Sequence, residues 1–218
     1  MNTQKYGQYI AEQIQGWPIG EPVTTTVVAD ALVDAFGMDL VNAKKITNVN
    51  MKRLADKGEL TRVQKGVYGR VKTTPFGKLK PSVEEMVTRV LLREGSTTIG
   101  YITGPSLLNS IGLSSWMPKE CHIATNHYRR QIPTGSKIRV YKPVVAISDE
   151  NALYLQTLEM LEAVEQYPID AENPDEILRV VLQRNRLDNE KLILYARRHY
   201  GLKVLLKTID IALGGVEL

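Results

Sequence analysis

Residues 42–70, with the sequence NAKKITNVNMKRLADKGELTRVQKGVYGR, constrain the fold of this chain more than any other stretch. Apolar residues recur at helical spacing up to Lys57, and Gly58 then stands where a left-handed residue commonly ends a helix. Residues 60–63 and 67–71 alternate as two short strands around a Gln-Lys-Gly turn. A basic helix followed by a small basic hairpin is typical of a winged helix-turn-helix.

Two shorter helices are predicted upstream of this basic helix. Residues 3–15 carry apolar residues at helical spacing, and a Gly-Trp-Pro-Ile-Gly turn follows them. Residues 27–36 form the second predicted helix, for which one threonine of 24–26 is the expected N-cap. Asn42 is the expected N-cap of the third helix. Residues 1–72 are therefore predicted to form a winged helix-turn-helix domain that binds DNA.

The third helix has two faces of different chemistry. Ile46, Val49 and Leu54 mark the side that we expect to be buried, and the cations and amides recur on another stripe. Arg, Lys and Asn side chains offer the hydrogen-bonding groups that read base edges, and cations on a wing contact phosphate or the minor groove. The residues expected to contact duplex DNA are Lys44, Lys45, Thr47, Asn48, Lys52, Arg53, Arg62, Lys65 and Arg70.

Basic residues are distributed unevenly along the chain. Residues 1–80 hold twelve Lys and Arg against seven Asp and Glu, whereas the remainder holds sixteen against seventeen. Between Lys44 and Lys80 alone, eleven basic residues stand against Asp56 and Glu59. This local excess is the pattern expected of a phosphate-binding surface, although a lysine-rich face that is only solvated has the same composition.

At 218 residues the chain is long enough for two domains of ordinary size. Residues 73–81 are rich in Pro, Gly and Lys and show no periodicity, so we predict a linker there. In the second domain, 82–218, residues 82–145 are predicted to mix helices and short strands, and residues 151–213 to be helical. The predicted fold class is α+β: a winged helix-turn-helix followed by a mixed α/β domain with a helical C-terminal half.

Composition limits the compartment and the chemistry. The single cysteine, Cys121, rules out an internal disulfide and fits a reducing cytosol. The first residues show no secretory signal, and no apolar run approaches the roughly 20 residues needed to span a membrane. No spacing suggests a metal site, and no nucleophile elbow, phosphate-binding loop or dinucleotide-binding turn is present. We therefore expect a cytoplasmic protein that is not an enzyme and binds no metal or cofactor.

A second candidate contact region lies in a predicted polar loop of the second domain. Asn126, His127, Arg129 and Arg130 cluster there, within the sequence NHYRR. Three interpretations are open for this cluster: a nucleic-acid contact, a contact with a protein partner, or an ordinary exposed loop.

Several strings in the sequence resemble those of a known family. They are GYITGPSLLNSIGL, HIATNHYRR and IRVYKP, which follow the wing end RVQKGVYGR. Over roughly residues 5–145 the chain is similar to the AbiEi-type antitoxins of type IV toxin–antitoxin systems. The resemblance implies an N-terminal winged helix-turn-helix joined to a larger antitoxin domain. It also implies repression of the protein's own promoter, expected to carry inverted repeats, and neutralisation of a partner toxin, typically an AbiEii-like nucleotidyltransferase.

Two other functions are open alongside this expectation. The first is a stand-alone winged-helix regulator, or a winged helix that binds protein or RNA, without an antitoxin role. The second is an enzyme, such as a nuclease, whose active site the sequence does not reveal. The function we expect is DNA binding for transcriptional repression, combined with an antitoxin role.

Overall fold

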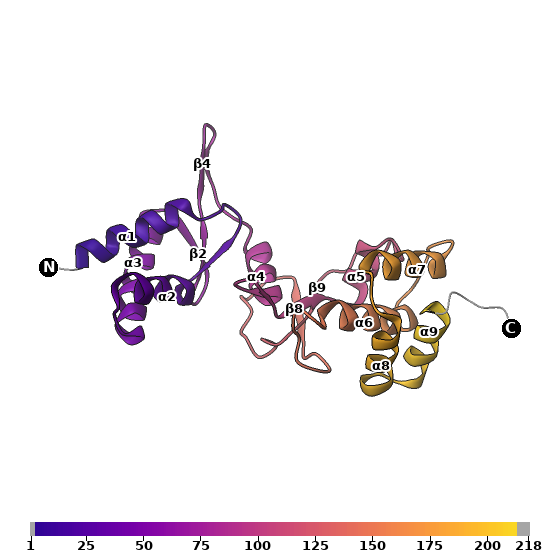
Figure 1. The fold of residues 1–218 in the computed structure, drawn as a ribbon. Coiled ribbons are helices and arrows are strands. Elements are labelled where there is room, and N and C mark those ends of the chain that lie inside the picture. Colours follow the sequence, from indigo (N-terminus) through magenta and orange to yellow (C-terminus); the bar gives the residue numbers. More distant parts are fainter. Residues whose placement is uncertain (1–2, 213–218) are drawn as a thin grey trace. The chain divides into compact units, whose positions relative to one another are not determined.

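The computed structural model describes residues 3–212, which form nine helices and ten strands in a mixed α+β fold (Figure 1). The chain divides into two compact units. The first unit comprises the residues up to Val90 together with Gln131–Ser136, and the second comprises Leu91–Arg130 and the residues from Lys137 on. Within residues 3–212, no helix combines the length and the apolar character that crossing a bilayer requires.

The first unit begins with three helices and a small antiparallel sheet. In the sheet, the central strand β3 pairs with β1 on one side and with β2 on the other. The elements in chain order are α1 (Thr3–Gly16), β1 (Pro22–Thr24), α2 (Thr25–Phe36), α3 (Leu40–Asp56), β2 (Leu60–Gln64) and β3 (Val67–Arg70).

The ends of these helices follow from local side chains. The hydroxyl of Thr24 accepts a hydrogen bond from the backbone N–H of Val27 at 3.3 Å, which confirms the threonine cap predicted for α2. Helix α3 begins earlier than predicted, because Asp39 and not Asn42 is its N-cap. The Asp39 carboxylate accepts from the backbone N–H of Asn42 at 2.9 Å, and this hydrogen bond lowers the pKa of Asp39.

One face of α3 packs against α1 and α2 to form the core of the first unit. The buried positions of α3 are Ala43, Thr47, Asn50, Met51 and Leu54, a single stripe at helical spacing. The prediction that the buried side contains Val49 was wrong, since its side chain is 50% exposed. The polar residues Thr47 and Asn50 are buried on this face instead. The amide of Asn50 donates a hydrogen bond to the backbone carbonyl of Ile46 at 2.9 Å, which satisfies its polar group.

Residues 73–81 are not the irregular linker that we predicted. Strands β4 (Lys72–Thr74) and β5 (Gly77–Leu79) pair antiparallel and form a second hairpin of the first unit. The Thr74 hydroxyl donates to the Gly77 carbonyl at 2.8 Å, and Gly77 supplies a φ of 118°, which a side chain would strain. Helix α4 (Val83–Leu92) follows, and the hydroxyl of Ser82 caps it by accepting from the backbone N–H of Glu85.

The second unit joins a three-stranded sheet to a helical layer. In the sheet, β9 lies between β8, its antiparallel partner, and β10, its parallel partner. The strands and the first helix of the second unit are β6 (Arg93–Glu94), β7 (Thr97–Thr98), β8 (Gly100–Ile102), α5 (Gly104–Ser110), β9 (Cys121–Thr125) and β10 (Ile138–Tyr141).

Most residues of the stretch 151–213, which was predicted to be helical, are helical. They form α6 (Ala152–Gln166), α7 (Pro174–Asn185), α8 (Asn189–His199) and α9 (Leu202–Ala212), whereas position 213 lies outside the described residues. Leu158 and Leu161 of α6 are completely buried among leucines of α5, α7 and α8. The core of this unit is therefore a helical one, with α6 at its centre.

The string GYITG connects the sheet of the second unit to α6. The Tyr101 hydroxyl donates to the Glu159 carboxylate at 2.7 Å, and the Thr103 hydroxyl donates to the other oxygen of the same group. Gly104 opens α5 with a φ of 58°, and a Cβ there would lie 2.9 Å from Nδ1 of His122. This motif therefore has a structural role in joining β8 to α6.

Gly100 is the position of this motif with the least room for a side chain. An added Cβ would meet the carbonyl oxygen of Leu91, and it would lie 2.9 Å from that of Ala124. Both obstacles are backbone atoms, so the strand pairing itself would have to shift. We expect Gly100→Ala to lower the free energy of unfolding by about 1–3 kcal/mol, the usual cost of overpacking.

Urea denaturation followed by circular dichroism measures this change. Gly201→Ala is the matched control in the same unit, because nothing lies within 4 Å of the Cβ that it would add. Equal stability of the two variants would contradict the close approach at Gly100.

Candidate nucleic-acid interface

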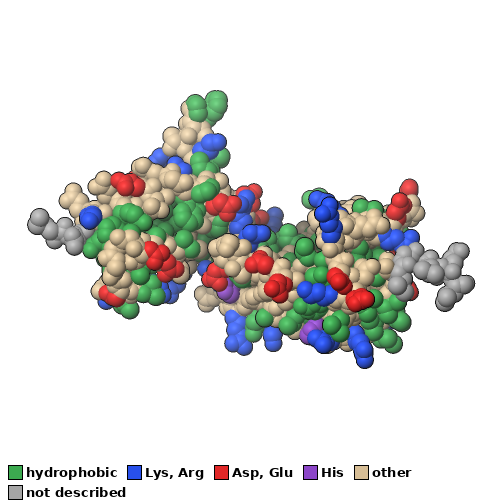
Figure 2. Space-filling view, in the orientation of Figure 1, with side chains coloured by type: hydrophobic (Ala, Val, Ile, Leu, Met, Phe, Trp, Pro, Cys, Tyr) green, Lys and Arg blue, Asp and Glu red, His purple; other side chains and the backbone are tan. Residues whose placement is uncertain are grey.

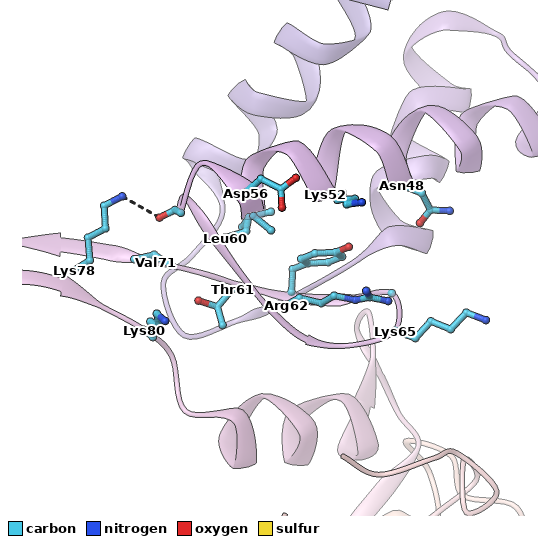
Figure 3. Close-up of a pocket in the computed structure, with 14 residues that line it drawn as sticks. Asn48, Lys52, Asp56, Leu60, Thr61, Arg62, Lys65, Val71, Lys78 and Lys80 are labelled. Atoms are coloured by element: carbon cyan, nitrogen blue, oxygen red, sulfur yellow. Dashed lines mark hydrogen bonds between the residues drawn. The ribbon is translucent and has the colours of Figure 1, made fainter. Parts of the chain in front are cut away.

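A pocket of about 660 Å³ lies in the first unit between α3, the β2–β3 hairpin and the β4–β5 hairpin (Figure 3). Asn48 and Lys52 reach it from α3, and Arg62 reaches it from β2 (Figure 3). Its lining residues are Asn48, Lys52, Ala55, Asp56, Gly58, Leu60, Thr61, Arg62, Lys65, Gly66, Tyr68, Val71, Lys78 and Lys80.

The charge of this pocket is strongly positive. The five cations in its lining stand against a single carboxylate, that of Asp56, and all five have exposed side chains. None of the ion pairs found among residues 3–212 involves any of these five cations. Cations held close together without acidic partners raise the local positive potential, which favours an anionic ligand. They are Lys52, Arg62, Lys65, Lys78 and Lys80.

The pocket brings together four of the residues predicted to contact DNA. Asn48, Lys52, Arg62 and Lys65 all line it, although Arg62 lies on β2 and Lys65 in the turn after β2. Three further predicted residues, Lys44, Lys45 and Arg53, are exposed on α3 but do not line the pocket.

Two of the predicted contact residues have other positions in the structure. Thr47 is completely buried on the core face of α3, so its side chain has no surface with which to contact DNA, and that prediction was wrong. Arg70 is half-buried, and its Nη1 donates to the backbone carbonyl of Trp17 at 2.8 Å. Arg70 thus joins the end of β3 to the turn after α1.

The sequence prediction missed two cations of the pocket, Lys78 and Lys80. They come from the β4–β5 hairpin, in the stretch that we expected to be a linker. Lys78 also fixes this hairpin to the end of α3, because its Nζ donates to the Gly58 carbonyl at 3.3 Å (Figure 3). The Thr-Thr-Pro-Phe-Gly sequence, in which two threonines precede a Pro-Phe-Gly turn, is the signal that could have indicated a hairpin.

In the second candidate region, the side chain of Asn126 has a structural role. Its Nδ2 donates to the carbonyl of Ile147 at 2.9 Å, and its Oδ1 accepts from the N–H of the same residue at 2.8 Å. Both ends of the amide are therefore used to hold the segment before α6. This pairing does not fit the partner contact that we considered for Asn126.

The other members of this region differ in exposure. Nε2 of His127 lies 3.8 Å from a carboxylate oxygen of Glu94, and its backbone N–H donates to the Thr125 hydroxyl. The guanidinium of Arg129 is exposed and lies 5.4 Å from the ring centre of Tyr128. Arg130 is half-buried, and this burial lowers the pKa of its guanidinium. Arg129 is thus the most accessible cation of the four predicted residues.

The Glu159 carboxyl is a partly buried titratable group of the second unit. Burial raises its pKa above the usual 4.5, against the opposing effect of the hydrogen bonds from Thr103 and Tyr101. Burial and the nearby carboxylate likewise raise the pKa of Tyr101. No sequence signal indicated this cluster, because its members are more than fifty residues apart along the chain.

Within the described part of the chain, no group of three or more His, Cys, Asp or Glu side chains is placed to hold a metal ion. His122 is buried beside Tyr141, whose hydroxyl lies 3.1 Å from Nδ1 of the imidazole. Burial lowers the pKa of His122, and the charge of Arg139 acts in the same direction. This pair fixes the parallel strands β9 and β10 from one side.

The chain is a mixed α+β protein with a cationic pocket in its first unit. Comparison with known proteins places it in a family. The chain belongs to a family of unknown function, DUF6088, whose sequence pattern matches residues 24–189. The match extends over parts of both units. No curated protein matches the sequence.

The raised pKa of Glu159 predicts a specific pH dependence of stability. Because the folded-state pKa lies above 4.5, the protonated carboxyl favours folding, and that contribution is lost as the pH rises through the folded-state value. We expect Glu159→Gln to become progressively more stable relative to the unsubstituted protein as the pH rises from below 4.5 to neutral.

Urea titrations over a pH series measure that relative stability. Glu172→Gln removes a carboxylate at an exposed position and is the control. A stability difference for Glu159→Gln that stays constant with pH would contradict the assignment.

Proposed function

We propose that the first unit is a winged helix-turn-helix that binds duplex DNA, and that the chain is a transcriptional repressor of its own promoter. The observation that carries the proposal is the cationic pocket, in which a helix amide and five cations from three elements meet. This arrangement combines groups that contact phosphate with a group that can read a base edge.

The order of elements in the first unit supports this interpretation. Three helices are followed by the β2–β3 hairpin, and β1 completes the sheet by pairing with β3. In a winged helix-turn-helix the third helix enters the major groove and the hairpin after it contacts the adjacent backbone. In this chain α3 would be the recognition helix and β2–β3 the wing.

Each side chain of the pocket has a distinct part in the proposed binding. The Asn48 amide has a donor and an acceptor, which suits adenine in the major groove. Lys52 on α3 and Arg62 and Lys65 on the wing line the same pocket and would contact phosphates. Lys44 and Lys45, nearer the start of α3, extend the same exposed cationic surface.

The resemblance to AbiEi-type antitoxins adds a second part to the proposal, an antitoxin role for the second unit. The residues that carry the resemblance include Tyr101 and Thr103, which hold Glu159 inside the unit. A partner toxin would have to contact other, exposed side chains, and Arg129 is one of them. The DNA-binding part does not depend on this role.

Removing two pocket cations tests the DNA-binding proposal. In fluorescence anisotropy titrations with a duplex from upstream of the gene, we expect Lys52→Ala combined with Arg62→Ala to weaken binding at least tenfold at low salt. Each lost phosphate contact lowers the slope of log affinity against log salt by about 0.9, so the slope should fall by about 1.8.

Two controls separate the pocket from general effects. Lys119→Ala combined with Lys203→Ala removes the same charge from exposed positions of the second unit, and should leave the slope unchanged. Thr47→Val changes a buried residue of α3 and should also preserve affinity. The proposal fails if the pocket variant keeps the salt slope of the unsubstituted protein, or if a single-stranded RNA of the same sequence competes as well as the duplex.

A further inference from the structure

Phe76 is an aromatic residue without a packing role in the first unit. It lies at the turn of the β4–β5 hairpin, and its side chain is fully exposed. The hairpin projects beyond α1, α2 and α3, with hydrophobic side chains at its tip and Lys or Arg side chains below them (Figures 1 and 2). A hairpin of two three-residue strands is only marginally stable by itself. An exposed aromatic residue at its tip does not stabilise it further, so this residue is better suited to a contact with another molecule.

The charge of this hairpin limits the kind of surface it can meet. Residues 72–80 include three lysines and no acidic residue. Two of the lysines, Lys78 and Lys80, line the cationic pocket, so the hairpin and the pocket form one continuous positive surface. A polyanion complements the positive charge of both the lysines and the pocket. Among polyanions, a nucleic-acid duplex also offers apolar base faces to an aromatic ring.

The strands of the hairpin set the separation between Phe76 and the lysines. Strands rise about 3.3 Å per residue, so Phe76 lies on the order of 7 Å beyond Lys78 along the hairpin. The hydrogen bond from Lys78 to the Gly58 carbonyl fixes the hairpin base to the end of α3, which limits how far the tip can swing.

We propose that Phe76 inserts between neighbouring base pairs of duplex DNA from the minor groove, while the hairpin lysines contact the flanking phosphates. Apolar wedges on proteins that bind the minor groove act in this way, by unstacking a base step that then rests against the side chain. The inference rests on the proposed DNA binding of the first unit. It adds to that proposal a second, non-electrostatic contact that does not depend on α3.

The test uses the full chain and the upstream duplex, with the fluorescent base 2-aminopurine substituted at successive positions. Unstacking raises the fluorescence of this base. We expect the unsubstituted protein to raise it at one or two adjacent positions only. Phe76→Ala should abolish the increase and weaken binding by about tenfold, in line with the loss of one base–aromatic stack. Its salt slope should not change, because no charge is removed.

Leu79→Ala is the matched control, because Leu79 is an exposed apolar residue of the same hairpin away from the tip. It should retain both the affinity and the fluorescence increase. Since the side chain of Phe76 is fully exposed, Phe76→Ala should unfold at the same temperature as the unsubstituted protein.

The outcomes separate this inference from the proposed function. If the protein binds the duplex but no position brightens, or if Phe76→Ala leaves the fluorescence increase intact, the wedge is wrong and DNA binding stands. If Phe76→Ala changes the oligomeric state in the absence of DNA, the tip docks on a second copy and the wedge is again wrong. If the unsubstituted protein does not bind the duplex, the proposed function fails and the wedge fails with it.

Discussion

The burial of one face of α3 against α1 and α2 determines where the other features of the first unit lie. Ala43, Thr47 and Met51 have no exposed surface, so the helix cannot rotate without opening the core. That constraint directs Asn48 and Lys52 outward, onto the side that the β2–β3 hairpin borders. The positive charge of the pocket is thus a consequence of apolar packing. The core fixes which side chains of α3 face the pocket, and the two hairpins add the remaining cations.

The second unit depends on a buried polar contact of a different kind. Tyr101 and Thr103 both donate to the carboxylate of Glu159, and a carboxylate taken out of water needs such donors. These hydrogen bonds join the sheet to α6, the central helix of the apolar core. Tyr101 and Thr103 of the GYITG string are therefore residues that the fold itself requires.

The elements that were predictable from the sequence are those with local causes. Helix α3 and the β2–β3 hairpin follow from apolar periodicity and from Gly58 and Gly66, both of which have a positive φ. The rotation of α3 was misjudged because Val49 is apolar but exposed, whereas the polar Thr47 is buried.

The β4–β5 hairpin was missed because three-residue polar strands have no hydrophobic alternation to detect. The pairing of Asn126 with Ile147 joins residues 21 apart, and no local pattern encodes it. The sequence therefore indicated much of the cationic site on α3 and the β2–β3 hairpin, but not the contribution of the β4–β5 hairpin.

Acetylation footprinting of lysines, with and without duplex DNA, tests whether the cationic pocket binds DNA, because it reads every accessible lysine of the unsubstituted protein at once. We predict that the duplex protects Lys52, Lys65 and Lys80, which line the pocket, and leaves Lys119 and Lys203 of the second unit as reactive as before. Protection confined to lysines of the second unit, or no protection at all under conditions where the duplex is bound, would contradict it.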